Sequence, residues 1–176
     1  IQLTDGRILS WTGGNSNTDY TARLWSVGGA KITILTGHSE GVEGAIQLAD
    51  GRILSWSWDN TLRMWSLDGT SITTLSGHTS SVWGALELAD GRILSWGGDP
   101  TLRLWSSDGT AITTLTGHKD SVLGALELRD GRILSWSGDY TLCLWNGNGV
   151  ATLIGHTQGV NGAIELQDGR VLSWSY

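Results

Sequence analysis

The chain has 176 residues, 39% of them hydrophobic, which is long enough to bury a core. Eleven Lys and Arg against seventeen Asp and Glu give a net charge of -6, which disfavours nucleic acid as a partner because no basic stripe can neutralise phosphates. No segment approaches the length of a membrane span, no signal peptide is visible, and a single cysteine, Cys143, excludes a disulfide framework.

One stretch of sequence recurs along the whole chain. DGRILSWSWDNTLRMW at 50–65 returns in close copies at 90–105 and 130–145. A looser copy with an extra segment around 13–18 opens the chain, and a truncated copy closes it. Successive Asp-Gly-Arg tripeptides lie 45, 40, 40 and 38 residues apart. A period near 40 indicates a solenoid, a propeller or an array.

Each repeat reads as four short antiparallel strands. Residues 52–57 alternate, with Leu54 and Trp56 on one face, which is the two-residue period of a strand. Three further runs of the repeat are equally short, and the Asp50-Gly51 pair between two of them predicts a tight hairpin with positive φ at both turn residues. No window carries an apolar helical stripe of useful length, so the predicted fold class is all-β.

A Gly-His dipeptide precedes the first strand of four repeats, and a Trp ends the third strand. With these features the chain resembles the WD-repeat (WD40) family, of the bacterial type with highly similar tandem repeats, over essentially its whole length. The resemblance implies a β-propeller built of four-stranded antiparallel blades, about four and a half of them here. One departure is that Ser or Asn replaces the Asp of the family's Trp-Asp dipeptide. The single segment 1–176 then divides into units 1–37, 38–77, 78–117, 118–155 and the half unit 156–176.

In WD repeats an imidazole, a carboxylate, a hydroxyl and the third-strand Trp form a hydrogen-bonded chain, and the resemblance implies the same here. We interpret it as a structural network that rigidifies each blade. The matching residues are His38, His78, His118 and His156; Asp19, Asp59, Asp99 and Asp139; Ser55, Ser95 and Ser135; and Trp25, Trp65, Trp105 and Trp145.

A Ser, a His and an Asp together also suggest a hydrolase, and four His residues suggest a metal site. Catalysis needs one special site, whereas this constellation returns in nearly every repeat. The His residues are spread one per repeat, without the spacing of metal ligands. We therefore expect no catalytic residue, no metal and no cofactor.

The strand count gives four full units and the first two strands of a fifth. A ring of about seven such blades needs roughly 280 residues, and the sequence begins without Met inside a strand, so we expect a piece of something longer. Three closures are open: further blades of the same polypeptide, a second chain, or an open array of copies joined through unpaired edges. Completion by more blades, in cis or in trans, is the favoured interpretation.

Function is expected where the repeats differ. After the Val that follows each Gly-His, and before the turn Asp, the side chains change chemistry from repeat to repeat. In WD-repeat propellers both places lie on the rim that commonly grips partners, and exposed Trp is a typical interface anchor. The alternative is that the two Trp residues only cover neighbouring loops. The candidate partner-binding rim is Trp58, Trp83, Glu43, Leu123 and Asn161, with the inserted segment 13–18 beside it.

The predicted function is a non-enzymatic scaffold for protein-protein interaction, an inference that rests on fold analogy. A self-assembling unit of a homo-oligomeric ring or filament is the second hypothesis. A carbohydrate-binding propeller that stacks sugars on Trp58 and Trp83 is the third. The expected partners are thus a protein or further copies of the chain, with a glycan as the less favoured choice.

Overall fold

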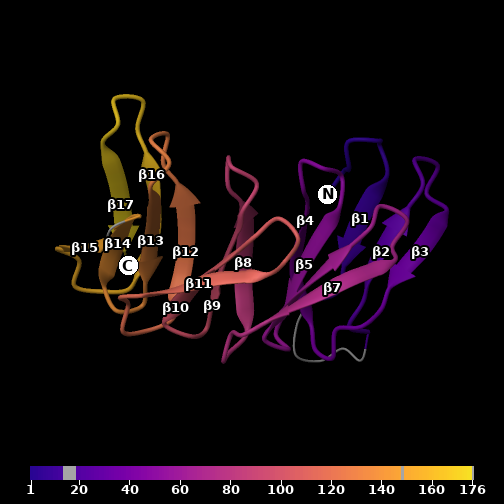
Figure 1. Ribbon diagram of the computed structural model, residues 1–176, viewed down its shortest axis with the longest axis horizontal. Coiled ribbons are helices and arrows are strands. Elements are labelled where there is room, and N and C mark those ends of the chain that lie inside the picture. Colours follow the sequence, from indigo (N-terminus) through magenta and orange to yellow (C-terminus); the bar gives the residue numbers. More distant parts are fainter. Residues whose placement is uncertain (14–18, 148, 176) are drawn as a thin grey trace.

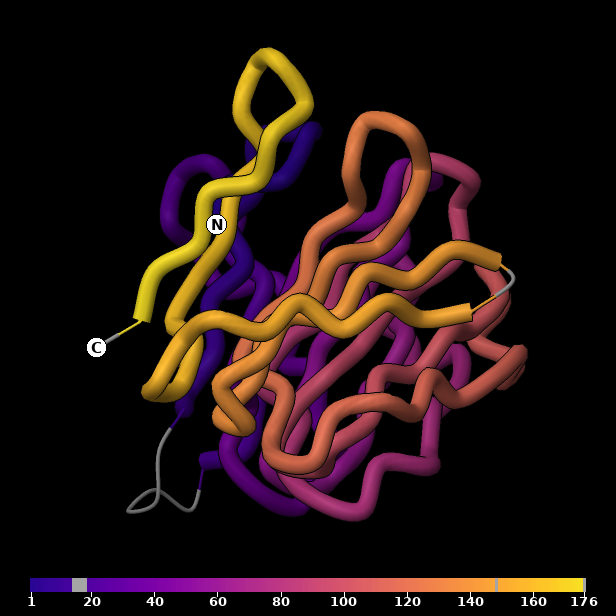
Figure 2. Tube along the Cα trace, turned by 90° about the vertical axis from the view of Figure 1, so that its left-hand side faces the viewer, coloured from indigo at the N-terminus to yellow at the C-terminus, as the bar shows by residue number. Residues whose placement is uncertain are grey.

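The computed structural model describes residues 1–13, 19–147 and 149–175, and all of the regular structure in these ranges is β-strand. The strands form five antiparallel sheets that follow one another in sequence order. In Figure 1 the first sheet lies at the right-hand end of the long axis and the last two lie at the left. Figure 2 shows the last hairpin in yellow and the hairpin before it, in orange, running across to the right.

The five sheets are blades 1 to 5 of a partial propeller. Blade 1 contains β1 (Ile8–Trp11), β2 (Ala22–Trp25) and β3 (Lys31–Leu35); blade 2 contains β4 (Val42–Gln47), β5 (Ile53–Ser57), β6 (Thr61–Trp65) and β7 (Ser71–Ser76); blade 3 contains β8 (Val82–Glu87), β9 (Ile93–Gly97), β10 (Thr101–Trp105) and β11 (Ala111–Thr116); blade 4 contains β12 (Val122–Glu127), β13 (Ile133–Ser137), β14 (Thr141–Asn146) and β15 (Gly149–Ile154); blade 5 contains β16 (Val160–Glu165) and β17 (Val171–Ser175).

The four-stranded unit is therefore present in full in blades 2, 3 and 4, and blade 5 has the two strands expected of a half unit. Blade 1 differs from the expected full unit. Its first strand is reduced to an isolated bridge between Gln2 and Ile8.

The Asp-Gly hairpins differ in turn type from the prediction. The Gly51 amide donates to the Leu48 carbonyl and the Leu48 amide to the Arg52 carbonyl, so the loop holds three residues. Of these three, only Gly51 has positive φ, at 91°. The glycine provides the left-handed residue of a bulged three-residue loop, and the Asp side chain instead accepts the Arg52 amide.

A glycine in the innermost strand of each blade makes room for an indole. In blade 3, a β-carbon built on Gly84 would lie 2.4 Å from Cζ2 of Trp96 on the neighbouring strand. The register of β8 and β9 shifts between Val82 and Gly84, so the ring lies flat over the glycine. The same contact recurs in blades 2, 4 and 5, and it explains why Gly follows the variable residue in every repeat.

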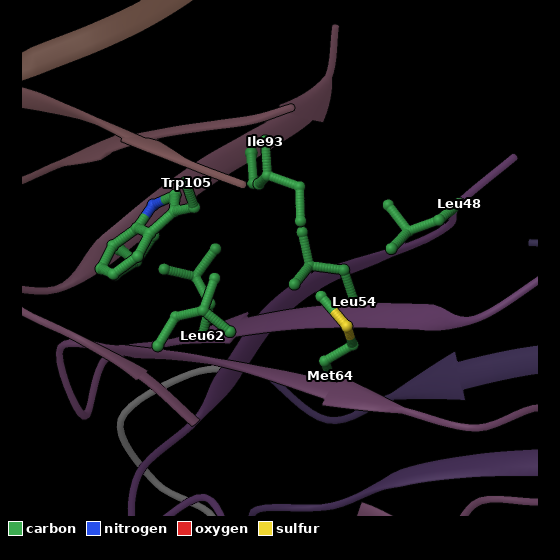
Figure 3. Packing of buried hydrophobic residues seen from close by; sticks show 9 residues of the cluster. Leu48, Leu54, Leu62, Met64, Ile93 and Trp105 are labelled. Carbon is green, nitrogen blue, oxygen red and sulfur yellow. The ribbon is translucent and has the colours of Figure 1, made fainter. Parts of the chain in front are cut away.

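The core is divided into layers between successive blades. Between blades 2 and 3, Leu54, Leu62 and Met64 of one blade pack against Ile93 and Trp105 of the next (Figure 3). Corresponding residues fill the other three junctions. Every blade thus presents two different apolar faces, one to the blade before it and one to the blade after it, and the burial of both faces holds the layers together.

A polar contact accompanies each apolar layer. The Glu87 carboxylate, at the end of β8, accepts the backbone amide of Ala49 in the hairpin of blade 2 at 2.7 Å. Glu127 and Glu165 repeat this bond to the preceding blade, and Gln47 does the same for the amide of Thr4 in blade 1. These bonds fix the position of each blade along the strand direction relative to the preceding blade, while the apolar layers fix the distance between the blades.

The contact between Gly84 and Trp96 yields a stability prediction. Gly84→Ala is expected to lower the free energy of unfolding by roughly 1–3 kcal/mol, because the added methyl group must displace the partly buried Trp96 indole. Gly155→Ala is the matched control, since no atom lies within 4 Å of a β-carbon there. Urea unfolding of both variants measures the difference, and equal stability of the two would contradict the close packing.

Candidate functional site: a buried polar chain and a variable rim

A chain of hydrogen bonds crosses the interior of blade 3. The Trp105 indole Nε1 lies 2.9 Å from Ser95 Oγ, and Ser95 Oγ lies 2.8 Å from His78 Nε2. On its other side, His78 Nδ1 lies 2.7 Å from Asp99 Oδ2. All four side chains are buried. The chain ties β9, β10, the turn between them and the segment before β8 into one unit.

One assignment of protons gives every donor and acceptor of this chain a partner. An indole N–H only donates, so Ser95 Oγ accepts from Trp105 and has its own hydrogen free to donate to His78 Nε2. The Nδ1–H then donates to the Asp99 carboxylate. This assigns a neutral imidazole with its proton on Nδ1, and every polar atom of the chain has a partner.

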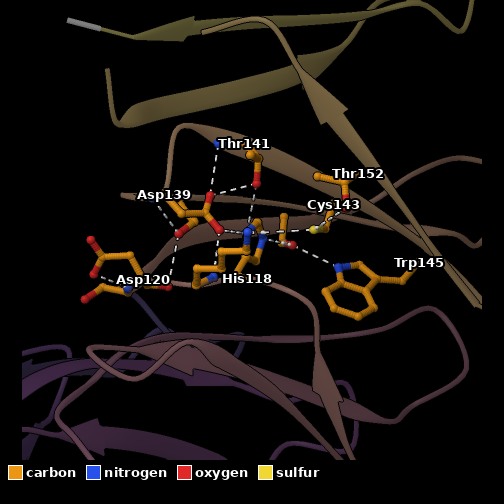
Figure 4. Close-up of polar contacts among 11 residues, drawn as sticks. His118, Asp120, Asp139, Thr141, Cys143, Trp145 and Thr152 are labelled. Atoms are coloured by element: carbon orange, nitrogen blue, oxygen red, sulfur yellow. Dashed lines mark hydrogen bonds and ion pairs between the residues drawn. The ribbon is translucent and has the colours of Figure 1, made fainter. Parts of the chain in front are cut away.

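The same chain is present in the two neighbouring blades. In blade 2 the successive links Trp65–Ser55, Ser55–His38 and His38–Asp59 measure 2.9, 2.9 and 2.8 Å. In blade 4 the links Trp145–Ser135, Ser135–His118 and His118–Asp139 measure 2.8, 2.8 and 3.1 Å. Figure 4 shows the blade 4 chain, with His118 between the carboxylate and the hydroxyl. Burial lowers the pKa of His118, which favours the neutral ring.

The chain is incomplete in the two outer blades. In blade 1, Trp25 still donates to Ser10 Oγ at 2.8 Å, but no Gly-His precedes that blade. The resemblance implies that Asp19 is the carboxylate of such a chain. Asp19 instead accepts hydrogen bonds from the Thr21 hydroxyl and from Arg23. In blade 5, His156 lies 2.8 Å from Ser173 Oγ and 3.1 Å from Ser175 Oγ, and no Asp takes part.

The carboxylates of the chain are held ionised. Burial by itself would raise the pKa of Asp99, but hydrogen bonds from the His78 imidazole, the Thr101 hydroxyl and the Thr79 amide outweigh it and hold the pKa well below its usual range. Asp59 and Asp139 have lowered pKa values in the corresponding surroundings. The Thr after the turn was not anticipated from the sequence, although Asp-x-Thr recurs in blades 2, 3 and 4.

Ser95, His78 and Asp99 have the connectivity of a hydrolase triad, but their surroundings differ from those of a catalytic triad. A nucleophilic hydroxyl must reach a substrate carbonyl beside an oxyanion site. Ser95 is completely buried, and its oxygen already accepts the Trp105 indole. Across the described ranges, no group of three His, Cys, Asp or Glu side chains comes together as a metal site.

Cys143 occupies the third-strand place that Arg23, Arg63 and Arg103 occupy in other blades. Its side chain is buried, with Sγ 3.8 Å from Nδ1 of His118. Burial raises the pKa of the thiol, so the reactive thiolate is disfavoured. The residue packs as a small apolar side chain beside the polar chain of blade 4.

The second candidate site is a rim of the propeller. There the turn between the second and third strands of a blade meets the segment that leads into the innermost strand. The Trp58 amide donates to the Gly41 carbonyl at 3.0 Å, which places that turn beside the start of β4. The Trp58 indole donates to the Glu43 carboxylate at 2.7 Å. The Ser81 hydroxyl of blade 3 reaches the Trp58 carbonyl at 3.4 Å and links the rims of the two blades.

Blade 3 fills the same place with a different residue. Gly98 stands where blade 2 has Trp58, and a β-carbon there would lie 3.3 Å from Cζ2 of Trp83, so the Trp83 ring lies over the glycine. Trp83 is 39% exposed and Leu123, at the same position in blade 4, is 37% exposed. Asn161 is exposed in blade 5. The expected contribution of the inserted loop falls on residues 14–18, outside the described residues.

Sheets layered face to face and each pinned by a buried polar chain define a partial β-propeller. The family model described as "WD domain, G-beta repeat" matches residues 29–66 and 69–106. The crystal structure of the WD40 β-propeller domain of Doa1 superimposes with a TM-score of 0.75 at 23% sequence identity, over 97% of this chain and 58% of that one. Two repeats of the chain thus match the WD40 family model, the chain as a whole has the fold of a WD40 β-propeller, and it spans somewhat more than half of that solved propeller.

No curated protein matches the sequence. Within the described residues, no helix is long and apolar enough to cross a membrane.

The buried carboxylates predict a loss of stability in acid. Unfolded Asp takes up a proton near pH 4, whereas folded Asp99 stays ionised to lower pH, so protons bind the unfolded state preferentially there. The free energy of unfolding is therefore expected to fall as the pH drops below about 4. Asp99→Asn is expected to cost roughly 1–3 kcal/mol at pH 7 and to flatten this slope.

Urea unfolding at a series of pH values measures the slope. Glu40→Gln removes an exposed carboxylate and is the control. A slope below pH 4 that is the same in Asp99→Asn as in the unmodified chain would show that Asp99 does not carry the acid sensitivity.

Proposed function

We propose that the chain is a non-enzymatic propeller scaffold for protein-protein interaction, and that its partner binds the rim formed by Trp58, Trp83, Glu43, Leu123 and Asn161. One observation carries the proposal. The polar chain, the glycine beneath the indole and the apolar layers repeat from blade to blade, whereas these rim positions differ in every blade.

The rim has the composition of an interaction surface. Trp83 and Leu123 present large apolar side chains to solvent, and Glu43 and Asn161 add polar groups around them. The rings are also held in place, since Trp58 donates to Glu43 and Trp83 rests over Gly98. Fixed aromatic side chains lose little conformational entropy on binding, which favours them as anchors.

A second candidate function, assembly through the face of blade 5, has its own observation. Leu54, Leu94 and Leu134 are completely buried between blades, whereas the corresponding Leu172 is 52% exposed and Trp174 is 46% exposed. Apolar faces of this kind are covered in blades 2, 3 and 4 by the next blade. A further blade, of the same polypeptide or of another copy, would complete the layer in the same way.

The rim proposal predicts how binding responds to Trp83. Peptides selected from a displayed library against the purified chain are expected to bind Trp83→Ala at least about tenfold more weakly, because truncation removes an aromatic anchor. Isothermal titration measures the affinities. Val27→Ala, on the exposed turn after β2, removes another exposed apolar side chain and should leave them unchanged. Selected peptides that bind both variants equally well would place the interaction elsewhere.

Assembly predicts that the isolated chain self-associates. Light scattering coupled to size exclusion should give a mass above 18.9 kDa, and Leu172→Ser combined with Trp174→Ser should return it to that value by making the exposed face polar. A monomer at every concentration would contradict assembly in trans and would leave completion by further blades of one polypeptide.

A further inference from the structure

The hairpin between the third and fourth strands of each blade closes the junction with the blade before it. In blade 3 this turn is Ser107-Asp108-Gly109, and a β-carbon on Gly109 would lie 2.9 Å from Thr73 Cγ2 and 3.1 Å from Leu75 Cδ1 of blade 2. The turn of blade 2 rests on Thr33 of blade 1 in the same manner. Each turn therefore covers the outermost strand of its predecessor.

An arginine holds each of these turns. Arg52, after the Asp-Gly hairpin of blade 2, donates through Nη2 to the Ser107 carbonyl at 2.6 Å. Arg7 of blade 1 donates through Nη1 to the Leu67 carbonyl of blade 2 at 2.8 Å. In both residues Nε is already bonded to the hairpin Asp, so one end of the guanidinium orients the side chain and the other end binds the neighbouring turn.

Blade 4 has a shorter turn. Gly117 follows Trp105 by 12 positions, whereas Gly155 follows Trp145 by only 10. In blades 1, 2 and 3 the last two strands carry a bulge beside the Trp, but β14 and β15 pair without one, and Asn146 faces Gly149 across a two-residue loop. The deletion thus removes both the bulged residue and one loop residue.

The shorter turn leaves the outer strand of blade 3 uncovered. Leu115 is half-buried, whereas the corresponding Leu75 under the full-length turn is buried, and Thr113 is exposed. A pocket of about 670 Å³ lies at this junction. It is lined by Arg92, Thr113, Leu115, Arg132, Trp145 and Val150, among others.

Arg92 is the arginine that corresponds to Arg7 and Arg52, and no turn reaches it. Among the described residues its guanidinium bonds only to Asp90, through Nε at 2.7 Å. Its side chain is 42% exposed, against 24% for Arg52 and 18% for Arg7. The end of the guanidinium that binds a carbonyl in the two preceding junctions therefore faces the pocket with its donors unpaired.

We propose that the pocket between blades 3 and 4 binds a turn from a partner protein, an Asp-Gly turn like those that close the other junctions, with a backbone carbonyl on Arg92. The chain itself shows this occupant twice, seated on the same strand and held by the same arginine. Trp145, Leu115 and Val150 supply an apolar floor, and the free end of the Arg92 guanidinium supplies donors for a backbone carbonyl.

This site is independent of the rim, because it is built from hairpins at the opposite ends of the strands. Its test uses a probe taken from the chain: the sequence Ser-Ser-Asp-Gly-Thr of residues 106–110, cyclised between two added cysteines so that the turn is formed before binding. The probe is titrated into the ¹⁵N-labelled chain and followed by nuclear magnetic resonance. Saturable shifts are expected at Thr113, Gly131 and Val150, with a dissociation constant on the order of 1 mM.

Two variants separate the pocket from unspecific binding. Arg92→Met should weaken the probe about tenfold, since a charge-assisted bond is lost, whereas Arg52→Met should leave its affinity unchanged, because the corresponding site is already filled. A graft that replaces residues 146–149 with Ser-Ser-Asp-Gly-Thr-Ala rebuilds the missing turn and should abolish binding. Absence of saturable shifts, or unchanged affinity in the graft, overturns the proposal.

Discussion

Each complete blade depends on one buried serine hydroxyl that accepts from an indole and donates to an imidazole. Ser95 bonds to both neighbours while Asp99 holds the other nitrogen of His78. Loss of any member leaves a buried polar atom without a partner, which costs more than the bond itself contributes. The polar chain therefore specifies a single arrangement of the strands, and the apolar layers between blades supply most of the free energy.

Once the interior is fixed in this way, differences between blades are confined to places that the polar chain does not reach. The rim is one such place, since Trp58 fills it from the turn after β5 and Trp83 fills the equivalent place of blade 3 from β8. The turn between the last two strands is another, where a deletion of two residues changes the junction with the preceding blade without altering the bonds of His118. Because the blades are repeats, a position that differs in one blade can be compared with the corresponding position in its neighbours.

The sequence predicts the period, the strands and the all-β propeller because alternation and turn residues are local signals that recur. Other features depend on groups far apart in the chain. The Asp50-Gly51 hairpin has three loop residues instead of two, since Asp50 binds the Arg52 amide. Arg52 binds the Ser107 carbonyl of the next blade, and the pocket at Arg92 follows only from that contact.

The exchange of the tryptophan indole hydrogens with solvent tests the central claim most directly, because each indole gives a separate resonance. If the Trp–Ser–His–Asp chain is the buried scaffold and the rim is open, Nε1–H of Trp65, Trp105 and Trp145 should exchange only through global unfolding. The exposed Trp83 indole should exchange rapidly. Exchange of the Trp105 hydrogen as fast as that of Trp83 would contradict the account.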